Sequence, residues 1–119
     1  MNAALQLAIE HAFQQAGHAM RAKQRADAFQ WLERAHILSQ RQPLLHARSH
    51  WLMLALGWQT GDYREVAGQI PRLFAALLFS RVWVPVGNTG RSRVSAFKPM
   101  PVPEQLQTLL DDKQRPPHR

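Results

Sequence analysis

The sequence predicts an all-α fold, namely a four-helix array of two stacked antiparallel helical hairpins followed by an extended, proline-rich C-terminal arm. Three observations predict it. Apolar residues recur at the i, i+3, i+4 and i+7 spacing of helices through residues 1–80. Helix-boundary residues interrupt that pattern at short intervals. Proline then occupies every second position from Pro99 to Pro103, which enforces an extended path.

The chain of 119 residues is expected to form a single domain over residues 1–110. Its helices should lie within residues 1–80, a packed arm should cover 81–103, and a short helix should follow over 104–110. A chain of this length buries somewhat more than about 60% of its unfolded surface, so it can build a real core. The polar residues 111–119 are expected to be a disordered basic tail.

Two helices are predicted in the first hairpin, over residues 3–23 and 27–40. Asp27 is a plausible N-cap for the second of them, because its side chain can accept a hydrogen bond from a free backbone N–H. Each helix carries one apolar face. The first face comprises Leu5, Ala8, Ile9, Ala12, Phe13, Ala16 and Met20, and the second comprises Ala28, Trp31, Leu32, Ala35 and Leu38.

The third predicted helix covers residues 44–59 and is expected to be the most buried. Pro43 suits its first turn, and Gly61 suits its end, because glycine accepts the left-handed backbone conformation that closes a helix. From Trp51 to Trp58 the segment is apolar on every side of a helical wheel. Such a helix requires other helices around it, so both tryptophans are expected to face the interior.

The fourth predicted helix covers residues 63–79. Asp62 followed by Glu65 predicts a capping box at its start. Pro71 removes a backbone hydrogen bond and should kink the helix or restart it. The expected apolar face comprises Val66, Ile70, Leu73, Phe74 and Leu77.

Composition limits the classes of function. Fifteen Lys and Arg against eight Asp and Glu give a formal charge of +7, which favours anionic partners. Nucleic-acid binding is nonetheless disfavoured, because the tryptophans fall on faces expected to be buried and so are not placed for base stacking. The absence of cysteine excludes disulfides and thiolate ligands. The sequence contains no recognisable signal peptide and no apolar tract of the length that spans a bilayer, so a cytoplasmic location is expected.

One histidine constellation points to chemistry. His46 and His50 are four residues apart on one face of the third helix. If the second and third helices turn over near Arg41, His36 lies at the level of Ala47, beside both. Three neutral imidazoles with an open position suit Zn, Cu, Fe or Ni. Glu33, three residues before His36, would add a carboxylate. The alternative is that each histidine is structural and bonds a carbonyl or a carboxylate.

A second candidate site is the turn GNTGRSR. Successive backbone N–H groups followed by arginines form a cradle for a phosphate or a carboxylate. Its residues are Gly87, Asn88, Thr89, Gly90, Arg91 and Arg93. The turn lacks the strand-loop-helix context of nucleotide-binding loops, so a purely structural turn is the alternative. No catalytic residues are assigned and an enzyme is not expected, because Ser49 and His50 point about 100° apart on a helix.

Two resemblances add to this reading. The segments DAFQWLERAHILS and GDYREVAGQI resemble helices of tetratricopeptide repeats, which supports stacked helix pairs. The segments LERAHILSQR, HARSHW and RVWVPVGNTGRSRVSAFKPMPVP, in that order and spacing, resemble a family of small bacterial proteins catalogued as domain of unknown function 3703. That resemblance implies a defined arm over residues 84–103 but no activity.

Two functions therefore stand side by side. The first is a non-enzymatic interaction domain that presents helical hairpins and the proline-rich arm to a protein partner or to a second copy of the chain. The second is a small helical metal-binding protein that uses His36, His46 and His50, with a transition-metal ion as its cofactor.

Overall fold

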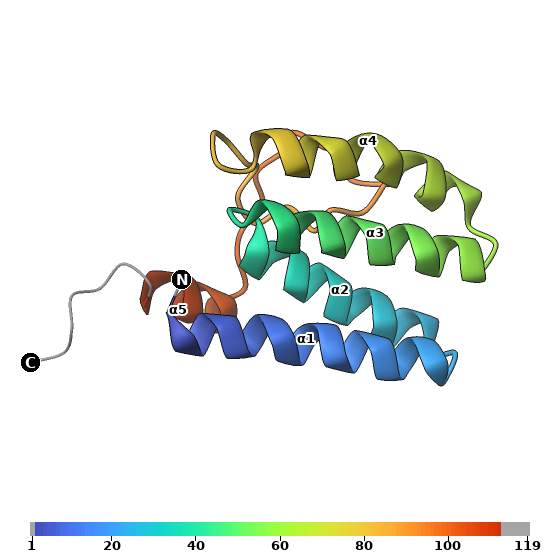
Figure 1. The fold of residues 1–119 in the computed structure, drawn as a ribbon, viewed down its shortest axis with the longest axis horizontal. Helices are drawn as coiled ribbons and strands as arrows, with labels where there is room; N and C mark the ends of the chain where they lie inside the picture. Colours follow the sequence, from blue (N-terminus) through green and yellow to red (C-terminus); the bar gives the residue numbers. More distant parts are fainter. Residues whose placement is uncertain (1, 113–119) are drawn as a thin grey trace, which may run out of the picture.

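The computed structural model describes residues 2–112 and has five helices within them. They are α1 (Ala3–Arg21), α2 (Arg25–Ser39), α3 (Pro43–Gln59), α4 (Tyr63–Phe79) and α5 (Glu104–Asp112). No strand occurs among these residues. Helices α1 to α4 lie side by side in chain order, each antiparallel to the one before (Figure 1). The predicted all-α array of two hairpins is confirmed.

Local signals explain most of the helix boundaries. The side chain of Asn2 caps α1 by accepting a hydrogen bond from the N–H of Leu5 at 2.7 Å. Pro43 occupies the first turn of α3, and Gly61 follows α3 with a φ of +74°. The expectation for Asp27 was wrong, because α2 already begins at Arg25 and Asp27 lies inside its first turn.

Helix α4 differs in one respect from the expected capping box. Asp62 does cap it, accepting from the N–H of Glu65 at 3.2 Å. The carboxylate of Glu65 makes no return bond to Asp62 and turns into the protein interior instead. The helix continues through Pro71 from Tyr63 to Phe79 without a restart, and the alternative, a kink at Pro71, stays a prediction.

The hydrophobic core lies mainly between α1 and α2. Its largest fully buried side chains are Leu5 and Ile9 of α1, Leu32 of α2, and Met53 and Leu56 of α3. The expectation that the third helix is the most buried was wrong, because α2 has the larger share of buried residues. Trp51 and Trp58 of α3 are 54% and 66% exposed. Their exposure removes the argument from buried tryptophans against contact with nucleic acid.

The face that α4 turns inward was also predicted wrongly. Ile70, Phe74 and Leu77 are exposed, whereas Glu65, Gln69 and Ala76 are buried. Helix α4 lies at the end of the array, and α3 is the one helix with which it makes extensive contacts. Its apolar stripe therefore has no helix to cover it. The polar stripe faces the protein interior instead, and this orientation builds the site described below.

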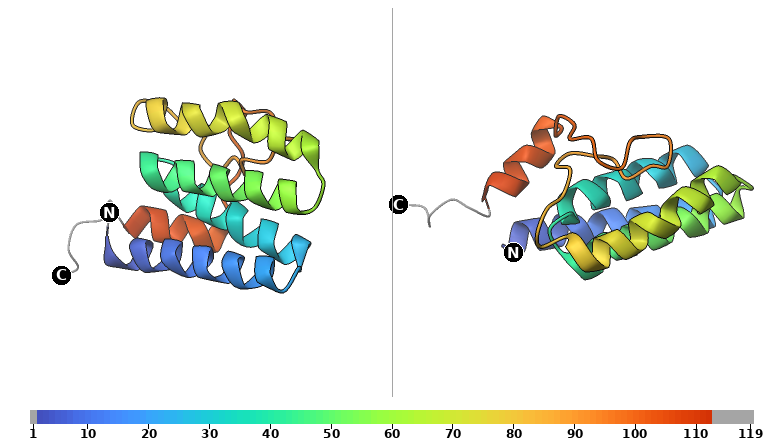
Figure 2. Two further views of the ribbon diagram at one scale, coloured as in Figure 1. Left: turned by 45° about the vertical axis from the view of Figure 1, so that its right-hand side comes forward. Right: turned by 90° about the horizontal axis from the view of Figure 1, so that it is seen from above.

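Residues 80–103 form the arm, an irregular segment that leaves the end of α4 and crosses one face of the helix layer before reaching α5 (Figures 1 and 2). It contains turns and no hairpin of strands. Val84 and Asn88 of the arm are buried. Helix α5 then packs against α2 and α1, and includes Asp111 and Asp112, which had been expected in the tail. The rest of that predicted tail, 113–119, lies outside the described residues.

None of the helices within residues 2–112 combines the length and the apolar character that crossing a bilayer requires.

Candidate metal centre

Three buried histidines meet where α2 and α3 turn over into one another. His36 comes from the last turns of α2, and His46 and His50 come from successive turns of α3. The turn at Gln40–Gln42 is short, so these parts of the two antiparallel helices lie opposite one another. The Nε2 atoms are 2.9 Å apart for His36 and His46, 3.1 Å for His46 and His50, and 3.2 Å for His36 and His50. The predicted convergence of the three imidazoles is present.

Each imidazole is held from behind through its other nitrogen. The Nδ1 of His36 lies 2.8 Å from the carbonyl oxygen of Asn88 in the arm. The Nδ1 of His46 lies 2.7 Å from the hydroxyl of Ser80, and the Nδ1 of His50 lies 2.6 Å from the side-chain oxygen of Gln69. Metal-binding histidines are oriented in the same way, by an outer partner on the nitrogen that does not ligate.

These partners determine which nitrogen of His36 and His50 carries the proton. A carbonyl oxygen only accepts, so Nδ1 of His36 must donate to Asn88. The amide nitrogen of Gln69 donates to the carboxylate of Glu65 at 2.6 Å and to the carbonyl of Gly90 at 2.8 Å. Its oxygen therefore faces His50 as an acceptor, and Nδ1 of His50 is the donor.

His46 follows the same pattern. The hydroxyl of Ser80 donates to the carbonyl of Ala76, so its oxygen accepts from Nδ1 of His46. All three imidazoles in their neutral form thus carry the proton on Nδ1. Three proton-free Nε2 atoms point at one another, and no hydrogen remains to form a hydrogen bond between any two of them.

The electrostatics of the site favour these neutral forms. Burial lowers the pKa of His46 to about 4 and the pKa of His50 to about 3. Burial, together with the neighbouring His50 and His46, lowers the pKa of His36 well below its ordinary value. A neutral imidazole is the form that ligates a metal, so the three nitrogens are available as ligands near neutral pH.

The spacing of the Nε2 atoms fits one ion. Nitrogens bonded at 2.0–2.1 Å in tetrahedral geometry lie about 3.3 Å apart, close to the 2.9 to 3.2 Å found here. The three Nε2 atoms could thus hold one ion at the bond lengths usual between zinc and histidine. The arrangement therefore has the form of a three-histidine face with one further coordination position.

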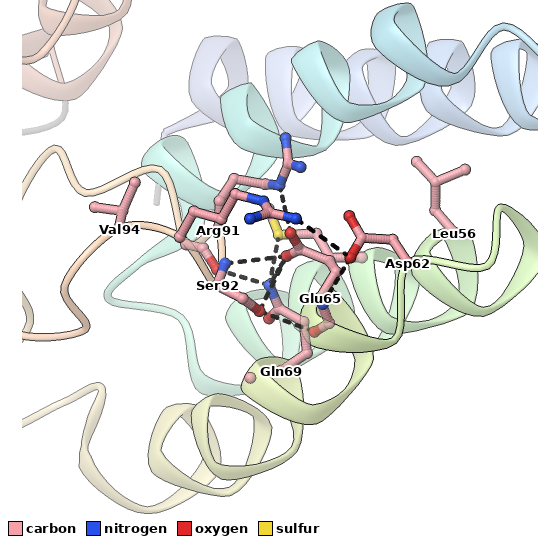
Figure 3. Close-up of polar contacts among 12 residues, drawn as sticks. Leu56, Asp62, Glu65, Gln69, Arg91, Ser92 and Val94 are labelled. Atoms are coloured by element: carbon pink, nitrogen blue, oxygen red, sulfur yellow. Dashed lines mark hydrogen bonds and ion pairs between the residues drawn. The ribbon is translucent and has the colours of Figure 1, made fainter.

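A buried polar network supports the Gln69 side of the site (Figure 3). The carboxylate of Glu65, whose side chain is 0% exposed, accepts from Gln69, from Nε of Arg91 at 2.9 Å and from the backbone N–H of Ser92 at 3.1 Å. Arg91 also pairs with Glu33 at 2.9 Å. The network links α2, α4 and the arm, so it holds the acceptor of His50 in place.

A cavity of about 440 Å³ opens beside the three histidines, all of which line it. Most of its other lining residues are apolar, and Arg72 is a charged exception. Three aromatic side chains of the lining are more than half exposed and mark where the cavity meets solvent: Phe79, Trp83 and Phe97.

The other candidate residues from the sequence lie elsewhere. Glu33 is engaged with Arg91 and is not part of the three-histidine group. In the turn, the N–H of Gly87 donates to Gln40, the N–H of Gly90 donates to the side chain of Asn88, and Arg91 is paired with two carboxylates. Arg93 lies 3.8 Å from Asp62. The turn thus contributes to the histidine site through the carbonyl of Asn88, and the anion cradle stays a prediction.

Sequence reasoning missed the outer partners Gln69, Ser80 and Asn88 and the buried carboxylate of Glu65. A signal for two of them was available, since Glu65 and Gln69 are four residues apart and share one face of α4. The apolar stripe on the other side of that helix was predicted to face the interior instead, which implies an exposed polar face. Nothing local in the sequence indicated the carbonyl of Asn88, which is 52 residues from its partner His36.

Comparison with known proteins identifies a family. The model of a family described as "Protein of unknown function (DUF3703)" matches residues 3–110. No curated protein matches the chain at a significant level, and neither does any solved structure.

Proposed function

The chain belongs to the DUF3703 family of proteins of unknown function, and we propose that it binds one divalent transition-metal ion through His36, His46 and His50. A single observation carries the proposal. Three Nε2 atoms that hold no proton converge within 3.2 Å of one another in a buried site. Their lone pairs repel one another unless a cation lies between them, and a divalent ion removes that repulsion.

The ligand set narrows the choice of metal. Imidazole suits Zn, Cu, Fe and Ni, and three neutral histidines with an open position are a known form of zinc site. The outer partners add support, because each Nδ1–H has an oxygen acceptor that orients the ring. The site contains no carboxylate among its three candidate ligands, so an ion there keeps its full positive charge.

Isothermal titration calorimetry of untagged protein with Zn²⁺ and Cu²⁺ tests the proposal. We expect one ion per native chain. His46→Ala and His50→Ala should each weaken binding by more than the roughly 10- to 100-fold that loss of an outer partner costs. His18→Ala is the matched control, because His18 is exposed on α1. Equal binding of micromolar affinity or weaker by all four proteins would contradict the metal site and leave the three histidines structural.

A second function is favoured by a separate surface. Helix α4 exposes an apolar stripe at i, i+4, i+7 and i+8, which comprises Ile70, Phe74, Leu77 and Leu78. Contiguous apolar surface of this kind marks contact with another protein. We infer an interaction role for α4, with a protein partner or a second copy of the chain. Analytical ultracentrifugation of native protein and of Phe74→Ser tests the second copy, since a dimer should dissociate more readily in the variant.

A further inference from the structure

We propose that the cavity beside the three histidines takes a small organic monocarboxylate, whose carboxylate binds the metal and whose aliphatic or aromatic body fills the cavity. The inference rests on the proposed metal site and names the class of ligand for it. Three features of the cavity carry it, namely its contact with the histidines, its charge and its walls.

The first feature is contact. His36, His46 and His50 all line the cavity, so an ion held by their Nε2 atoms has the cavity as a neighbour. Three protein ligands leave a fourth position of a tetrahedral ion for water or a ligand. A molecule in the cavity therefore reaches the open position without displacing any histidine.

The second feature is charge. Among the described residues that line the cavity none is acidic, and Arg72 contributes a positive charge. The nearby buried carboxylate of Glu65 is already engaged by Arg91, Gln69 and Ser92. A divalent ion held by three neutral imidazoles would thus face a cavity with positive charge and no anion of its own. An anionic ligand supplies the missing charge, and a carboxylate oxygen is an accepted ligand of Zn.

Arg72 is placed to attract such a ligand. Its guanidinium donates to the carbonyls of Gly68 at 2.9 Å and Val94 at 2.6 Å, which holds it between α4 and the arm. A guanidinium has five N–H donors, so these two bonds leave others for a carboxylate. The charge is fixed in position by the protein before any ligand arrives, which lowers the cost of ordering it on binding.

The third feature is the wall. Apart from the polar end at the histidines, the cavity is lined mainly by apolar side chains, among them Pro71, Ala76, Val84 and Ala96. Its volume of about 440 Å³ lies in the range of sites that bury small organic molecules. Inorganic anions and acetate leave these walls in contact with water. A longer apolar body covers them and gains affinity by the hydrophobic effect.

The test uses the full chain loaded with Co²⁺, whose visible absorption reports changes in its ligands. Acetate, butyrate, hexanoate and octanoate are titrated in turn, and octanamide serves as the uncharged counterpart of octanoate. We expect a saturable spectral change with each carboxylate. Affinity should rise by up to about fourfold for each added methylene until the cavity is full. Octanamide should leave the spectrum unchanged at the concentrations at which octanoate saturates.

Two variants locate the ligand. Ala75 is exposed and lines the cavity, so Ala75→Trp should narrow its opening and weaken octanoate binding by about tenfold or more, while acetate and Co²⁺ affinities stay as in the native chain. Ala67→Trp, also exposed on α4 but away from the cavity, is the matched control and should bind octanoate normally.

The outcomes separate the two proposals. If Co²⁺ binds but octanoate binds no more tightly than acetate, the proposal of a monocarboxylate with an apolar body in the cavity is overturned and the metal site stands. The same conclusion follows if Ala75→Trp and Ala67→Trp behave alike, or if octanamide matches octanoate. If the native chain takes up no Co²⁺, the proposed function fails and the ligand assignment fails with it.

Discussion

Gly90 lies directly against the imidazole of His36. A Cβ atom built on Gly90 would be 2.6 Å from Cδ2 and 2.7 Å from Nε2 of that ring, closer than carbon atoms can approach. Gly90 also has a φ of +85°, a conformation that side chains with a Cβ disfavour. The arm thus reaches the site through a residue without a side chain, which lets its backbone pack on a metal-ligand candidate.

Gly90→Ala should therefore weaken metal binding by at least about tenfold, because the added methyl group displaces the His36 ring from the other two. Gly61→Ala is a control matched in backbone conformation. Its φ is +74° but no atom lies within 4 Å of the added methyl. It should cost about 1 kcal/mol of stability and leave metal affinity unchanged. Calorimetric metal titration measures the affinity of both variants, and thermal unfolding measures their stability. Equal metal affinities would show that the contact between Gly90 and His36 does not affect metal binding.

Gln69→Leu should lower metal affinity by roughly 10- to 100-fold, although Gln69 is not a ligand. The substitution removes the oxygen that accepts from His50 and the amide that donates to Glu65. His50 is then free to rotate or to carry its proton on Nε2. Gln14→Leu, on the exposed side of α1, is the control. The prediction fails if Gln69→Leu destabilises the fold yet binds metal with native affinity.

Glu65 and Glu33 offer a comparison around one arginine. Arg91 pairs with both at 2.9 Å, but the side chain of Glu65 is 0% exposed and that of Glu33 is 28% exposed. Glu65→Gln should cost about 2–3 kcal/mol of unfolding free energy, because the buried carboxylate accepts charge-assisted hydrogen bonds from Arg91 and leaves its donors poorly matched when it is replaced by an amide. Glu33→Gln should cost about 1 kcal/mol or less. Urea unfolding measures the loss of unfolding free energy in each variant. Similar losses would contradict the prediction that the buried Glu65–Arg91 pair contributes more to stability than the Glu33–Arg91 pair.

Metal-free protein should lose stability as the pH falls below about 6.5. The unfolded chain then takes up protons on its histidines near their ordinary pKa of about 6.5. Folded His46 resists protonation down to a pKa of about 4, and folded His50 down to about 3. Over that interval the unfolded state binds more protons, so each of these histidines contributes a loss of about 1.4 kcal/mol per pH unit.

His50→Gln isolates this contribution from that of other groups. Urea unfolding in the presence of a chelator, between pH 6 and pH 4.5, should give a pH dependence that is smaller by about 1.4 kcal/mol per pH unit in the variant than in the native chain. Identical slopes for the two proteins would show that His50 titrates normally in the folded state.

Most of the helix boundaries, and the placement of α2 beside α3, follow from local features of the sequence. Pro43 and Gly61 through their backbone geometry, and Asp62 through its side chain, each act within one helical turn, so their effects do not depend on the rest of the fold. The short turn between α2 and α3 forces those helices to be antiparallel. That constraint alone brings His36 opposite His46 and His50, so the three-histidine cluster was predictable from residue numbers.

The surroundings of the histidine cluster, by contrast, depend on how the whole chain packs. Periodicity tells which residues share a face of α4, but not which face finds a neighbour. Because α4 ends the array, its apolar stripe with Phe74 stays exposed while Glu65 and Gln69 turn inward. The arm then brings Asn88 to His36 across 52 residues and seats Gly90 on the same ring. These contacts join segments distant in the chain, so their formation depends on packing of the whole fold rather than on any local preference.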